Sequence, residues 1–135
     1  MRRYDAYVSA LAVLSHAPQQ DLTNEFIQSG IVDKFSLQFE LGWKLLKDLL
    51  RYEGVANAAS ESPRDIVKAA HRYFEFVDEE AWLNMLRDRN TIAHVYDAQR
   101  LQELLSRILG KYIAVFQDLE EAVASHYADE LDNIA

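Results

Sequence analysis

The chain has 135 residues, 50% of them hydrophobic, with no cysteine and a formal net charge of −8. This composition excludes a disulfide framework, a thiolate metal site and a membrane span of about twenty apolar residues, and it argues against broad, sequence-independent binding of nucleic acid, which depends on a net positive field. We therefore expect one soluble, cytoplasmic domain over residues 1–135, in which any binding of nucleic acid requires a local basic surface.

The spacing of apolar residues predicts two helices in the first half of the chain. The first has one face formed by Tyr4, Tyr7, Leu11 and Leu14, and it ends near Ala17-Pro18. The second is long, starts from caps between Asp21 and Asn24, and ends at Gly54, a plausible glycine at the C′ position. Its inward face carries Phe35, Phe39, Trp43, Leu46 and Leu50.

Three further helices are expected in the second half, starting from the caps Ser62 (followed by Pro63), Asp78 and Asp97. On the short third helix, the residues expected to face inward are Ile66, Ala69 or Ala70, and Tyr73. The stripe of the fourth carries Trp82, Met85 or Leu86, Arg89, and Ile92 or Ala93. The last helix is lined by Leu101, Leu104, Leu105, Ile108, Tyr112, Val115, Phe116, Leu119 and Val123.

No useful stretch of the sequence alternates polar and apolar residues with the period of two that a half-buried strand requires. The sequence therefore predicts an all-α protein, an antiparallel four- or five-helix up-and-down bundle. The two long helices have wide apolar faces, and homodimers are the commonest oligomers. We therefore expect a homodimer in which part of that apolar surface is buried.

One cation falls on an apolar stripe of the fourth helix. Arg89 follows Met85 and Leu86 by three or four residues, and a guanidinium is costly to bury unless an anion pairs with it. Arg87 is expected instead on the polar face, which it shares with Glu80, Asn84, Asp88 and Thr91. Two interpretations of Arg89 stay open: it pairs with a buried carboxylate such as Glu40, or it belongs to a functional site.

His94 and Tyr96 follow Arg89 near the turn before the last helix. A histidine with a pKa near neutrality can take a proton from a ribose 2′-hydroxyl or give one to a leaving 5′-oxygen, while an arginine holds the phosphate. A histidine and an arginine placed in this way could cleave RNA with no metal ion and no other cofactor. A symmetric dimer would place two such histidine–arginine pairs face to face. The structural alternative is that His94 caps a helix end.

Five basic residues are candidates for contact with RNA or with a protein partner: Arg64, Lys68, Arg72, Lys44 and Lys47. The first three recur, with His71, along one face of the third helix, and they could form the basic track that an acidic protein needs. The structural alternative is a solvated helix face. The two lysines of the second helix are spaced for i,i+3 and i,i+4 pairs with acidic neighbours such as Glu40.

Two segments resemble motifs of a known family. Arg89-Asn90-Thr91-Ile92-Ala93-His94-Val95-Tyr96 resembles the R-x4-H-x-Y motif of HEPN-domain proteins. Phe39-Glu40-Leu41-Gly42-Trp43-Lys44-Leu45-Leu46-Lys47 is similar to the FE-x-x-WK-x-x-K signature of one group among them, the nucleotidyltransferase substrate-binding proteins, which are the toxin half of HEPN/MNT toxin–antitoxin pairs. R-x4-H alone is a weak pattern, but both segments together make the resemblance specific, and it covers nearly the whole chain.

The resemblance implies a homodimeric bundle with the motif in a cleft at the dimer interface, and a small nucleotidyltransferase (MNT) as antitoxin partner. It implies that Arg89 and His94 are the catalytic residues of a metal-independent endoribonuclease, and that the partner silences the toxin by adenylylating Tyr96. The motif residues that would support catalysis are Asn90, Arg87 and Glu40.

Three functions therefore compete. The first is the toxin ribonuclease. The second is a noncatalytic subunit that presents substrate to a nucleotidyltransferase, and the third is a plain helical assembly domain, which would leave Arg89 unexplained. Catalysis requires a titrating His94 close to Arg89, whereas binding alone would tolerate glutamine at position 94.

Overall fold

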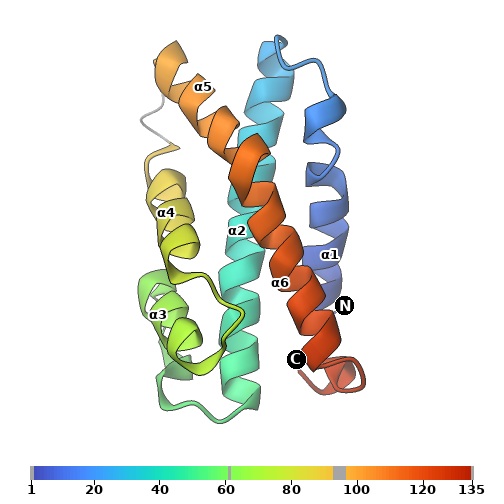
Figure 1. Ribbon diagram of the computed structural model, residues 1–135, viewed down its shortest axis with the longest axis vertical. Helices are drawn as coiled ribbons and strands as arrows, with labels where there is room; N and C mark the ends of the chain where they lie inside the picture. Colours follow the sequence, from blue (N-terminus) through green and yellow to red (C-terminus); the bar gives the residue numbers. More distant parts are fainter. Residues whose placement is uncertain (1, 61, 93–96, 135) are drawn as a thin grey trace.

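A computed structural model describes residues 2–60, 62–92 and 97–134, and within these ranges every regular element is helical (Figure 1). The α-helices are α1 (Arg3–Leu14), α2 (Glu25–Tyr52), α3 (Pro63–Tyr73), α4 (Glu79–Asn90), α5 (Ala98–Arg107) and α6 (Ile113–His126). A π-helical turn (Ile108–Tyr112) joins α5 to α6, and short 3₁₀ turns lie at Ala17–Gln19, Ala56–Ala59 and Leu131–Asn133. The predicted all-α fold is confirmed.

The helices form an up-and-down bundle around α2, the longest of them (Figure 1). Helices α1 and α4 flank α2 and run antiparallel to it. Helices α5 and α6 descend obliquely across the bundle, α5 in contact with α2 and α6 packed against α1. The short α3 contacts both α2 and α4. Since α5 and α6 follow one continuous path, the described residues form the five helical segments that the sequence predicted. None of the helices in the described ranges is long and apolar enough to cross a membrane.

The predicted helix boundaries depend on residues that satisfy free backbone groups. Asn24, Ser62, Asp78 and Asp97 each accept a hydrogen bond from a backbone N–H in the first turn of the following helix. At the end of α2, Gly54 has a φ of 74°, and the next N–H donates to the carbonyl of Leu50 at 2.9 Å. This is the Schellman turn that a C′ glycine permits.

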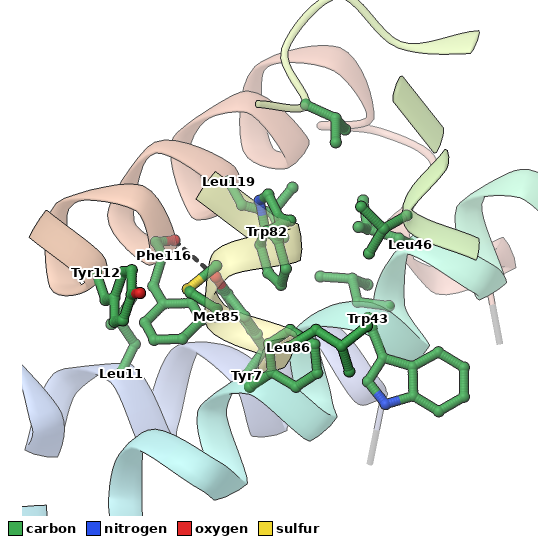
Figure 2. Close-up of a cluster of buried hydrophobic side chains, with 14 of the residues drawn as sticks. Tyr7, Leu11, Trp43, Leu46, Trp82, Met85, Leu86, Tyr112, Phe116 and Leu119 are labelled. Atoms are coloured by element: carbon green, nitrogen blue, oxygen red, sulfur yellow. Dashed lines mark hydrogen bonds between the residues drawn. The ribbon is translucent and has the colours of Figure 1, made fainter. Parts of the chain in front are cut away.

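The core is an aromatic cluster drawn from four helices (Figure 2). Phe35 on α2 stacks on Tyr112 with ring centroids 5.4 Å apart, and Trp82 on α4 meets Phe116 on α6 edge to face at 5.7 Å. The buried hydroxyl of Tyr7 on α1 donates to the carbonyl of Phe116 at 2.7 Å. Trp82 also packs against Phe39 on α2, so it fixes α4 against both α2 and α6, and α4 carries the first part of the R-x4-H-x-Y segment.

Asp88 corrects one sequence-based expectation, because it is buried instead of lying on the polar face of α4. The residue is 5% exposed, and its carboxylate accepts hydrogen bonds from Arg107 Nε at 2.8 Å, Arg107 Nη2 at 3.1 Å and the Tyr112 hydroxyl at 2.5 Å. Burial and the bond to Asp88 raise the pKa of Tyr112 well above 10, so the phenol stays protonated and donates throughout the neutral range. The carboxylate thus fastens the last turn of α4 to the end of α5.

Two other expectations are also wrong in detail. Tyr73, predicted to face inward, is 49% exposed and donates its hydroxyl to Glu53 at 3.1 Å. The predicted last helix is not uniform, because the π-helical turn containing Gly110 interrupts it. Turns of this kind are frequent near functional sites, and this one ends at Tyr112, one of the two residues that bond Asp88.

Candidate functional site

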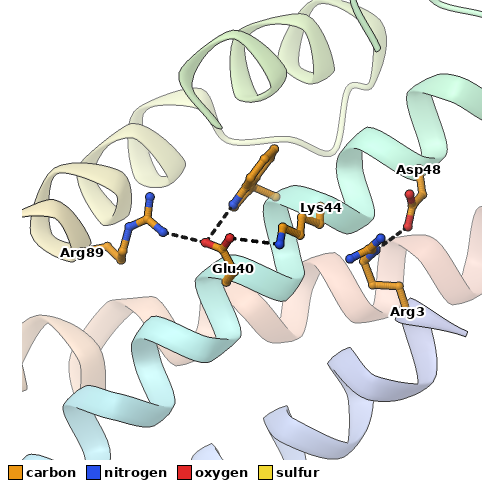
Figure 3. A network of polar contacts seen from close by, with 6 residues as sticks. Arg3, Glu40, Lys44, Asp48 and Arg89 are labelled. Atoms are coloured by element: carbon orange, nitrogen blue, oxygen red, sulfur yellow. Dashed lines mark hydrogen bonds and ion pairs between the residues drawn. The ribbon is translucent and has the colours of Figure 1, made fainter. Parts of the chain in front are cut away.

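The two segments that carry the family resemblance meet in space (Figure 3). Arg89, in the last turn of α4, places Nη1 2.6 Å from Oε2 of Glu40, which lies in the middle of α2. Its guanidinium carbon lies 5.2 Å from the centroid of the Phe39 ring, and its Nε donates to Oδ1 of Asn90 at 3.2 Å. The ion pair is the one that the structural alternative for Arg89 expected, and it accounts for a half-buried guanidinium on an otherwise apolar stripe.

Glu40 is the centre of this network. Besides Arg89, it accepts a hydrogen bond from the indole Nε1 of Trp43 at 3.1 Å and pairs with Nζ of Lys44 at 3.2 Å (Figure 3). Residues three and four positions apart lie on one side of a helix, which is why the glutamate, tryptophan and lysine of FE-x-x-WK converge. The sequence predicted Trp43 only as a core residue, and its polar role followed from the same i,i+3 spacing.

The charge state of Glu40 depends on these neighbours. Burial raises the pKa of its carboxyl group, but the hydrogen bonds from Trp43 and Lys44 and the charges of Lys44 and Arg89 outweigh burial, so the net pKa lies below its usual 4.5. Glu40 is therefore ionised at neutral pH and holds the guanidinium of Arg89 in a fixed position.

Replacing Glu40 by glutamine is expected to lower the free energy of unfolding at pH 7 by less than about 1 kcal/mol, because the network is partly exposed to solvent. A lowered carboxyl pKa stabilises the fold above the unfolded pKa of 4.5, and this contribution is lost as the pH falls through the folded value. Urea unfolding should thus show the variant and the wild type converging below pH 4. A difference that grows at low pH would contradict the lowered pKa.

His94 and Tyr96, the predicted catalytic and regulatory residues, lie outside the described residues. On either side of them, Asp97 caps the start of α5 as predicted, whereas α4 ends at Asn90, before the Ile92 or Ala93 that the predicted stripe included. The roles of both residues therefore remain predictions from the sequence.

Arg89 shares a pocket with three other predicted site residues. The pocket has a volume of about 580 Å³ and lies between the start of α3 and the last turns of α4. Arg64, Arg87 and Asn90 line it together with Arg89, and Leu83 is among its apolar lining residues. The structure thus brings a residue of the predicted basic track next to the R-x4-H-x-Y segment, although the two are separated by more than twenty positions in the sequence.

The remaining predicted contact residues are placed differently. Lys68 and Arg72 line a separate, smaller pocket of about 210 Å³ with Ser60 and Asp65, so the predicted basic track of α3 is divided between two pockets. Lys44 is half-buried in the Glu40 network. Lys47 is only 6% exposed, which makes it a buried residue of α2 and not one presented on the surface.

The family described as nucleotidyltransferase substrate binding protein like matches residues 2–125, which include both motif segments and all the arginines of the larger pocket. No curated protein matches the sequence significantly.

Proposed function

The chain belongs to the nucleotidyltransferase substrate-binding-like family, and from this we propose that it is a HEPN-type toxin: a metal-independent endoribonuclease that a nucleotidyltransferase partner neutralises. The observation that carries the proposal is the position of Arg89. It is held by Glu40 at the edge of a pocket that two further arginines line, a setting suited to a phosphate group.

In the proposed reaction, Arg89 binds the scissile phosphate. Its Nη2 makes no hydrogen bond to any residue that the structure describes, so this nitrogen can donate to a phosphate oxygen while Nη1 stays on Glu40. The contact would also stabilise the extra negative charge that develops on phosphorus in the transition state. Pre-ordering by Glu40, Asn90 and Phe39 reduces the conformational freedom that the long side chain must lose on binding.

His94 supplies the proton transfers in this proposal. One imidazole removes the proton of the ribose 2′-hydroxyl, and the 2′-oxygen attacks phosphorus as the bond to the 5′-oxygen breaks. A second imidazole, from the other copy in a homodimer, gives a proton to the leaving 5′-oxygen. The products are a 2′,3′-cyclic phosphate and a free 5′-hydroxyl, and no metal ion or other cofactor takes part.

Regulation by the partner would act on Tyr96. The phenolic oxygen attacks the α-phosphorus of ATP on the nucleotidyltransferase, an AMP group is transferred to the tyrosine, and pyrophosphate leaves. A bulky anion two residues from His94 would then occupy the place of the RNA phosphate.

The test is incubation of the purified protein, without its partner, with end-labelled tRNA and mRNA in EDTA. We expect fragments that end in 2′,3′-cyclic phosphate from the wild type and none from Arg89→Ala or His94→Ala. The exposed residues Arg51 and His16 offer matched controls, since Arg51→Ala and His16→Ala remove the same groups elsewhere and should cleave as the wild type does. Equal background cleavage by all the variants would reject the ribonuclease.

The second candidate is a noncatalytic subunit that binds substrate for a nucleotidyltransferase. The Glu40–Arg89 pair fits this candidate too, because a guanidinium held in a fixed position can bind a phosphate group without any chemical step. The two functions differ in their dependence on His94: binding of RNA by His94→Gln as tight as by the wild type, with no cleavage by either, would support the binding subunit.

A further inference from the structure

The pocket beside Arg89 has properties that the proposed reaction does not use. Its volume of about 580 Å³ lies in the range of sites that hold a small ligand. One part of its lining is apolar, formed by Pro63, Leu83 and Leu86, and the other is cationic and polar, with Arg64 and Arg87 beside Ser62, Asn90 and Thr91. Such a pocket can accept a ligand that is flat and apolar at one end and anionic at the other.

The two arginines are available for an anion. Arg64 and Arg87 are both exposed, and neither forms an ion pair or a side-chain hydrogen bond with the part of the chain that the structure describes. The planar guanidinium matches two phosphate oxygens at once, and it also stacks on aromatic bases.

We infer that this pocket holds the nucleotide next to the scissile phosphate of a single-stranded RNA, with Arg64 and Arg87 on its phosphate and the leucines under its base. The inference rests on the proposed function, because it takes Arg89 as the residue that binds the scissile phosphate. A single strand is required, since only an unpaired base can turn into a pocket on a protein surface.

The same reasoning excludes the other half of the basic face of α3. Lys68 and Arg72 line a pocket of about 210 Å³, which is less than half as large, and the carboxylate of Asp65 lies in it with them. Their pocket does not include Arg89. The strand therefore runs over the start of α3 and the end of α4 and not along the whole of α3.

The test measures binding of a 2′-O-methyl oligonucleotide, which lacks the attacking hydroxyl and cannot be cleaved, to the full chain by fluorescence anisotropy. We expect Arg64→Gln/Arg87→Gln to raise the Kd at least about tenfold and to reduce the slope of log K against log salt by about 1 or more, as the loss of phosphate contacts does. Lys68→Gln/Arg72→Gln also removes two positive charges, but from the neighbouring pocket, and it should change the Kd less than about twofold.

Equal weakening by the two double variants would overturn the inference, because it would show an effect of net charge alone. Competition by ATP as effective as that by the oligonucleotide would assign the pocket to a free nucleotide, and equal competition by an acidic peptide would assign it to a protein; either result overturns the RNA assignment. If only Arg64→Gln/Arg87→Gln loses RNA binding and the wild type cleaves no RNA, the pocket binds RNA as inferred but the proposed ribonuclease activity is rejected. If the wild type cleaves RNA and Arg64→Gln/Arg87→Gln binds the oligonucleotide as tightly as the wild type does, the assignment of this pocket is rejected and the ribonuclease is not.

Discussion

Asp88→Ala is expected to lower the free energy of unfolding by about 2–4 kcal/mol. The substitution leaves the buried hydroxyl of Tyr112 without its acceptor, which costs about 1–3 kcal/mol, and it leaves Arg107 without its anion. Breaking a fully buried ion pair from one side costs about 3–5 kcal/mol, but the side chain of Arg107 is 42% exposed, so water recovers much of that part. The expected total is large for a polar residue in a domain of this size.

Urea unfolding followed by circular dichroism would measure this loss. Asp88→Asn keeps an oxygen for the Tyr112 hydroxyl and should lose about half as much, and Tyr112→Phe should lose about 1 kcal/mol. The double variant Asp88→Ala/Tyr112→Phe should be more stable than the sum of the two losses predicts, because the second change removes the unpaired hydroxyl. Asp33→Ala, an exposed position on α2, is the control. A loss at Asp88 no larger than at Asp33 would contradict the structural role assigned here.

The expectation that Asp88 lies on the polar face of α4 was wrong for an identifiable reason. The predicted stripe runs through Trp82, Met85 or Leu86, and Arg89, but the buried face of α4 is wider than this stripe. Ala81, Met85 and Asp88 form a second buried line at spacings of four and three, and this spacing was visible in the sequence. What the sequence could not show is that Arg107 and Tyr112, nineteen and twenty-four positions later, would lie opposite the carboxylate.

The fold was predictable because the sequence features that determine its helices are local. Caps, the C′ glycine and a helical period each act within a few residues, and those features of the sequence agree with one another. The candidate site was predictable only in part. The helical stripe indicated Arg89 and offered Glu40 as its partner. That Arg64 and Arg87 line one pocket depends on how α3 packs against α4, which no local pattern encodes. The same packing separates Lys68 and Arg72 from a track that looked continuous.

Two substitutions of glycine by alanine in α2 are expected to have opposite effects, which differ by about 1.5–4 kcal/mol. A Cβ at Gly42 would lie 2.5 Å from Cη2 and 2.9 Å from Cζ3 of Trp82, and 3.2 Å from the Tyr7 ring. Trp82 is buried, with Phe39 and Phe116 against it, so its ring has little room to move. A Cβ at Gly30 would meet nothing within 4 Å.

Gly42→Ala should therefore destabilise the protein by about 1–3 kcal/mol, even though alanine favours the helix. Gly30→Ala should stabilise it by about 0.5–1 kcal/mol through that helix preference alone. Thermal and urea unfolding of the pair would measure both effects. Trp82→Phe removes the atoms that the new methyl group meets, so the loss caused by Gly42→Ala should be smaller in that background than in the wild type. Stabilisation by both alanines would instead mean that the Trp82 ring yields freely, and that the close approach of α4 to α2 beside Glu40 does not depend on a glycine.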